Sequence, residues 1–84
     1  MNNIVMRKIT VNTDYQPLVD SKLVASVTIS AFPSNAGNVL FKGDDGTDVP
    51  WVPGEWHDFQ SVNLADIQVK GTEGDAISVI GGTW

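Results

Sequence analysis

The fold is decided by residues 23–31, which read Leu-Val-Ala-Ser-Val-Thr-Ile-Ser-Ala. Every odd-numbered residue of this stretch is apolar, while Ser26, Thr28 and Ser30 carry hydroxyl groups at even-numbered positions. A period of two predicts a β-strand with one buried face, because successive side chains of a strand point to opposite sides. A slip of one residue would bury the hydroxyl groups, so we expect the register of this strand to be firmly fixed.

Outward from this strand, the chain reads as further short strands separated by turns. Residues 4–12 alternate in a similar way and end at the turn-forming residues Thr13–Pro17. In residues 38–84, turn residues recur roughly every 8–12 positions, a spacing typical of small all-β proteins. We interpret this half as one uninterrupted β-meander, with residues 63–66 able to form a single helical turn at a corner.

These patterns predict one all-β domain over residues 1–84. The expected architecture is a small antiparallel β-sandwich or jelly-roll-like barrel of roughly six to eight short strands. Residues expected to face outward, or across an interface, are Lys8, Thr28, Gln68 and Ser78. Residues expected in the core are Ile9, Val11, Leu23, Ala25, Val27, Ile29, Val69, Ile77 and Val79.

Length and composition restrict how such a domain is stabilised. The chain has 84 residues, no cysteine and one histidine, which excludes disulfides and a zinc site of the usual ligand type. A core this small usually needs an additional source of stability, and oligomerisation is the one that remains. We therefore expect a homo-oligomer, with a trimer favoured, and no cofactor.

The charge balance and the hydropathy pattern exclude several partners. The net charge is −5, with ten acidic and five basic residues, which argues against nucleic acid and anionic membranes. No apolar run approaches the ~20 residues of a membrane-spanning helix. The N-terminal residues lack the apolar core of a signal peptide, so we expect synthesis in the cytoplasm.

Two groups of polar residues are candidates for chemical sites. Asp44, Asp45 and Asp48 bring three carboxylates close together, but their spacing is not that of a calcium loop, so a solvated turn is expected. Glu55, His57 and Asp58 resemble an acid–base set, yet Glu55 and His57 should face one side of a strand and Asp58 the other. We predict no catalytic residues, no metal site and no enzyme activity.

Tryptophan is abundant for so small a core. Trp51, Trp56 and Trp84 could pack inside the chain, anchor an interface between proteins, or stack on sugars. All three are candidate interface residues, and Trp84 is favoured because Gly81 and Gly82 predict a flexible tail that can reach a neighbour. A carbohydrate-binding module that uses exposed Trp51 and Trp56 is the alternative function.

Three runs resemble a pattern of turns and strands found in small virion proteins of tailed bacteriophages. These runs are Asp48–Phe59, Val62–Gly71 and Gly74–Gly81, and the resemblance covers residues 38–81. It implies a structural protein of the virion, a capsid decoration (cement) protein or a head or tail accessory protein. The partner implied is the major capsid protein or another virion protein, to which this chain would bind as a symmetric oligomer.

Overall fold

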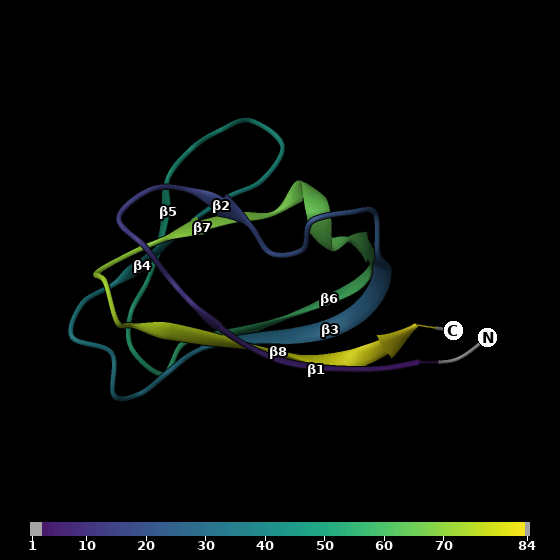
Figure 1. Ribbon diagram of the computed structural model, residues 1–84, viewed down its shortest axis with the longest axis horizontal. Coiled ribbons are helices and arrows are strands. Elements are labelled where there is room, and N and C mark those ends of the chain that lie inside the picture. Colours follow the sequence, from purple (N-terminus) through teal and green to yellow (C-terminus); the bar gives the residue numbers. More distant parts are fainter. Residues whose placement is uncertain (1–2, 84) are drawn as a thin grey trace.

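The computed structural model describes residues 3–83, which form eight β-strands and one short 3₁₀ turn. The strands make two four-stranded antiparallel sheets that pack as a sandwich (Figure 1). The first, here called the long sheet, contains in spatial order β1 (Asn3–Thr10), β8 (Ala76–Thr83), β3 (Val24–Ala31) and β6 (Trp56–Asn63). The second, the short sheet, contains β2 (Gln16–Pro17), β7 (Gln68–Lys70), β4 (Val39–Lys42) and β5 (Val49–Trp51). The predicted all-β sandwich is confirmed.

The strand order is that of a jelly roll, because the chain crosses repeatedly between the sheets and the last strand, β8, lies between β1 and β3. The interpretation of residues 38–84 as an uninterrupted meander is therefore wrong. Within residues 3–83, the hairpin β4–β5 is the only case in which consecutive strands are neighbours in a sheet. Turn spacing reveals how long the strands are, but it does not reveal which sheet each strand joins. The expected turn at Thr13–Pro17 also contains the two-residue strand β2, which pairs with β7.

The predicted faces of the strands are confirmed. Of the residues expected in the core, Ile9 and Leu23 are partly buried and the others are buried. Lys8 and Gln68 are exposed, whereas Thr28 and Ser78 are half-buried on the outer side of the long sheet. The core also contains Leu18, Val19, Val39, Phe41 and Leu64, which were not predicted, and Trp51, for which packing inside the chain was one of the alternatives.

The predicted helical turn at residues 63–66 is present as η1 (Leu64–Asp66). Asn63 caps it, since its Oδ1 accepts hydrogen bonds from the backbone N–H groups of Ala65 and Leu23, both at 3.1 Å. The turn buries Leu64 and connects β6 to β7. Within residues 3–83, no helix is long and apolar enough to cross a membrane.

A buried carboxylate holds the loop that precedes β4. Asp75 accepts hydrogen bonds from the backbone N–H groups of Ala36 (2.9 Å) and Gly37 (3.1 Å). The adjacent Asn35 amide bonds both backbone groups of Ala76, at 2.9 and 3.0 Å. Burial of Asp75 is tolerated because the charge receives two donors. The sequence indicated only a turn here, since the partners lie about forty positions away along the chain.

The expectation of a flexible tail at Gly81 and Gly82 is wrong. Both glycines lie in β8, where Gly81 is opposite Val5 of β1 and Val27 of β3. A Cβ atom at position 81 would lie 2.0 Å from the carbonyl oxygen of Ser26, so the backbones approach too closely for any side chain. Gly81 therefore serves close strand packing and not flexibility. Trp84, the favoured interface residue, lies outside the described residues.

Candidate interaction surfaces

Apolar side chains are exposed mainly on one surface, the outer side of the long sheet. Of the seven large hydrophobic residues that are exposed in residues 3–83, five occupy outward positions on this sheet. Val49 and Val52 are the other two. We call this surface the outer face, and its apolar members are Ile4, Met6, Val24, Trp56 and Ile80.

Strand pairing arranges the outer face in cross-strand rows. Met6 of β1 lies opposite Ile80 of β8, and Ile4, which is 81% exposed, follows two positions away on the same side. Cross-strand pairs and residues two apart on one strand are in reach of each other. Ile4, Met6 and Ile80 therefore form one apolar cluster at the β1 edge of the sheet. Trp56, which is 59% exposed, lies on β6 at the opposite edge.

The middle of the outer face is polar. Thr28 lies between Ile80 and Asp58, and its hydroxyl group donates a hydrogen bond to the Asp58 carboxylate. A shallow hollow of about 320 Å³ opens here, and Ser26 and Gln60 also line it. The face thus combines apolar ends with hydrogen-bonding groups at its centre.

A β-bulge interrupts the pairing of β6 with β3. Val27 pairs with Phe59 and Ala25 with Val62, so β6 has one more residue than β3 between these pairs. Ser61 adopts a φ of 52°, in the left-handed region, and its N–H group donates a hydrogen bond to Ser26 Oγ at 3.0 Å. The bulge ends the first regular segment of this edge strand after Phe59.

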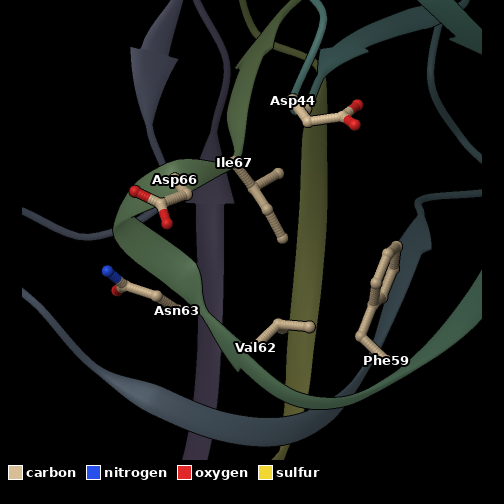
Figure 2. A pocket seen from close by; sticks show the side chains of 7 residues that line it. Asp44, Phe59, Val62, Asn63, Asp66 and Ile67 are labelled. Atoms are coloured by element: carbon tan, nitrogen blue, oxygen red, sulfur yellow. The ribbon is translucent and has the colours of Figure 1, made fainter.

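A groove of about 570 Å³ opens beside β6, at the mouth of the sandwich. Figure 2 shows Phe59, Val62 and Ile67 projecting into it, so its floor is apolar. The carboxylate groups of Asp44 and Asp66 stand at its rim, directed away from the floor. The groove adjoins a smaller cavity of about 180 Å³ that Phe59 and Ile67 also line, and which extends toward Trp51.

Trp51 lies inside this end of the core. It is 5% exposed, and its ring centre lies 4.0 Å from that of Phe41 and 6.4 Å from that of Phe59, to which it is stacked. His57 packs against it edge-on at 4.8 Å. Of the alternatives left open for Trp51, the structure favours packing inside the chain over an interface or sugar stacking, because these rings cover its faces. Of the three tryptophan candidates, Trp56 is the exposed one among the described residues.

The structure divides the expected acid–base set between two sides of β6. Glu55 Oε2 and His57 Nε2 are 2.7 Å apart, and the N–H group of Val52 donates to Glu55 Oε1 at 3.0 Å. The hydrogen bond with His57, followed by that from Val52, lowers the pKa of Glu55. Asp58 belongs to the outer face instead, as the strand alternation predicted. The Glu55–His57 pair closes the turn before β6, and Asp58 does not join it.

Two of the three carboxylates of the β4–β5 loop, Asp45 and Asp48, make separate local contacts, while Asp44 stands at the rim of the groove. Asp45 Oδ1 accepts a hydrogen bond from the Thr47 N–H group at 2.9 Å, which lowers the pKa of Asp45. Asp48 accepts one from the Tyr15 hydroxyl group at 2.5 Å. No group of three or more potential metal ligands occurs within residues 3–83. The geometry is that of a solvated loop, which the hydrogen bond between Asp48 and Tyr15 attaches to the rest of the chain.

The hydrogen bond between Tyr15 and Asp48 can be tested by spectroscopy. Its ring lies beneath two ammonium groups, with Lys42 Nζ at 4.2 Å and Lys70 Nζ at 4.7 Å from the ring centre. Burial, and then the hydrogen bond and negative charge of Asp48, raise the pKa of Tyr15 to about 12. The fold thus favours the neutral phenol. This contribution to stability is complete below pH 10.0, the ordinary pKa, and is lost as the pH rises to about 12.

We expect the phenolate absorbance of Tyr15, the single tyrosine of the chain, to appear near pH 12. Asp48→Asn should lower this pKa, because it removes the negative charge, whereas Asp45→Asn should leave it unchanged. Ultraviolet difference spectra, with circular dichroism to follow folding, measure both. A folded wild-type protein that titrates at the same pH as the urea-unfolded chain would contradict the contact.

The comparisons with known proteins identify no family. No protein-family model matches the chain. No curated protein matches it either. Among solved structures, it is similar to a de novo designed double-stranded β-helix determined by NMR in solution, with 20% sequence identity and a TM-score of 0.41. That alignment covers 99% of this chain and 96% of the designed one.

Proposed function

We propose that this chain is a non-enzymatic structural protein of a tailed-bacteriophage particle, a capsid decoration protein that docks on another virion protein through its outer face. The observation that carries the docking role is the gathering of exposed apolar side chains on one face of the long sheet. Such patches on soluble proteins mark interaction sites, because leaving them in water is unfavourable. The viral setting comes from the sequence resemblance over residues 38–81.

The composition of the outer face suits a protein partner. Ile4, Met6 and Ile80 supply apolar area at one edge, and Trp56 supplies a large aromatic anchor at the other. Aromatic residues and methionine are enriched in protein interfaces, and a few such anchors carry most of the binding energy. The partner proposed is the major capsid protein or another virion protein, with this chain acting as a homo-oligomer, in keeping with the trimer expected from its size.

The test is binding to particles that lack this protein. We expect the double variant Met6→Ser/Ile80→Ser to bind about tenfold more weakly or worse, since it removes the centre of the apolar cluster. Val52→Ser is the matched control, because Val52 is 55% exposed but lies in a loop outside the outer face. Co-sedimentation of fluorescently labelled protein with the particles measures the affinity. Equal losses for both variants, or none for either, would refute docking through this face.

One observation favours carbohydrate binding as a second candidate. Trp56 is exposed two positions from Asp58, and the polar hollow on the same face contains Asp58, Gln60 and Thr28. An exposed indole beside a few convergent polar groups is an arrangement able to orient a sugar ring. Polysaccharides that shift the tryptophan fluorescence of the wild-type chain but not that of Trp56→Ala would support this candidate over the first.

A further inference from the structure

The two outer strands of the long sheet have backbone groups that face away from the sheet. In antiparallel pairs, successive residues direct their N–H and C=O groups alternately toward and away from the neighbouring strand. The hydrogen bond from Val11 N–H to Asp75 C=O (2.9 Å) shows that odd-numbered residues at this edge face β8. The backbone groups of Met6, Lys8 and Thr10 therefore face outward, and the C=O group of Thr10 there accepts a hydrogen bond from Gln16 Nε2 at 3.0 Å.

The same reasoning applies to β6 at the opposite edge. The hydrogen bond from Ala31 N–H to Glu55 C=O (2.8 Å) shows that odd-numbered residues here face β3. Trp56 and Asp58 consequently direct their backbone groups away from the sheet. Edges of this kind are templates for an added strand.

The two edges carry opposite charge. β1 contains the adjacent cations Arg7 and Lys8, whereas β6 contains Asp58 and adjoins the groove with Asp44 and Asp66 at its rim. Within residues 3–83 the single ion pair is Glu55–His57, so neither cation has a carboxylate partner among these residues. Lys8 Nζ instead lies 5.4 Å from the centre of the Phe32 ring, an exposed contact that it can exchange for a carboxylate.

We infer that β1 of a second copy adds antiparallel to β6, with Lys8 of that copy opposite Asp58. This pairing deepens the proposed function, since it rests on the homo-oligomer and names its interface. The pairing is compatible with the geometry of an antiparallel sheet, in which opposite residues direct their side chains to the same face. Lys8 and Asp58 both have outward backbone groups, and both side chains belong to the outer face. In this register Arg7 of the second copy enters opposite Phe59, at the mouth of the acidic groove.

The geometry also sets the form and the strength of the assembly. Because β1 contacts β6 and not itself, the contact is heterologous, and repetition of such a contact closes a ring or extends a filament. A cyclic trimer is compatible with it. The bulge at Gln60 and Ser61 limits regular pairing to residues 56–59, so the interface is small and its affinity should lie in the weak, reversible range.

Charge exchange tests this interface on the purified chain, without a particle. Lys8→Asp and Asp58→Lys each place like charges opposite each other, and each should weaken association about tenfold or more in sedimentation velocity over a concentration series. The double variant Lys8→Asp/Asp58→Lys should restore association to within about threefold of the wild type. An equimolar mixture of the single variants should also associate, through contacts between unlike variants, whereas each variant alone should not.

The controls are Lys22→Asp and Asp14→Lys, which change the net charge equally at exposed positions outside both edges. They should associate like the wild type, and thermal melts should show that every variant is folded. A wild-type chain that remains monomeric, or a double variant no better than the single ones, would overturn the inference. Docking through the outer face is tested separately, by binding to particles, so failure of this inference can be distinguished from failure of the proposed function.

Discussion

Replacing Gly81 by alanine is expected to destabilise the fold by about 3 kcal/mol, at the upper end of the cost of overpacking a core. The new Cβ would lie 2.0 Å from the Ser26 carbonyl oxygen and 2.7 Å from the Val27 Cα. Both neighbours are backbone atoms of β3, which cannot move aside by a rotamer change. Relief requires separating β8 from β3 in the middle of the long sheet, at the cost of ladder hydrogen bonds.

Alanine variants of two other glycines serve as controls, because they separate this steric clash from the other effects of replacing a glycine. At Gly43 a Cβ meets nothing within 4 Å, so Gly43→Ala should change the free energy of unfolding little and should favour folding slightly by restricting the unfolded chain. Gly74 also has open space but a φ of 95°, so Gly74→Ala should cost about 1 kcal/mol from backbone strain alone. Urea unfolding followed by circular dichroism measures all three. A Gly81→Ala variant no less stable than Gly74→Ala would show that the strands are not packed so closely.

The strand faces could be predicted from the sequence because strand periodicity is local. The alternation of residues 23–31 identified Val27 and Ile29 as buried, and Asn63 ahead of Leu64 identified the helical turn. In each case the signal lies within a few residues of the structure that it specifies. The order of strands in the sheets has no such local signal, which is why the interpretation of residues 38–84 as a meander is wrong although the predicted sandwich is confirmed.

The candidate surfaces show a similar limit. On β1, apolar residues occupy both faces, since Val5 is buried whereas Ile4 and Met6 are exposed. The periodicity there cannot tell the core from an interface until β8 fixes the pairing. Gly81 likewise reads as a flexible residue, and only the approach of β3 shows why it must lack a side chain. Sequence reasoning therefore found the candidate Trp56 but missed the apolar cluster at the other edge.

Trp51 and Trp56 are five positions apart, and their replacement should have opposite consequences. Trp51→Ala is expected to cost about 3–5 kcal/mol, as truncation of a buried aromatic residue does, because Phe41, His57 and Phe59 all lose contact with the indole. That is a large part of the ~5–15 kcal/mol by which domains are stable, so we expect the variant to be partly unfolded at physiological temperature. Thermal and urea unfolding followed by circular dichroism give the value.

Trp56→Ala should alter the free energy of unfolding by less than about 1 kcal/mol, because its indole projects from the outer face into solvent. The same change should weaken binding to the partner about tenfold or more, if Trp56 is the aromatic anchor of the outer face. Each variant is the other's control: one tests packing and the other tests recognition. Normal docking by a folded Trp56→Ala protein would remove the anchor from the proposal and leave the cluster of Ile4, Met6 and Ile80 to provide the binding energy. A Trp56→Ala protein as unstable as Trp51→Ala would instead show that this indole belongs to the core, and that the outer face is not the docking surface at its β6 edge.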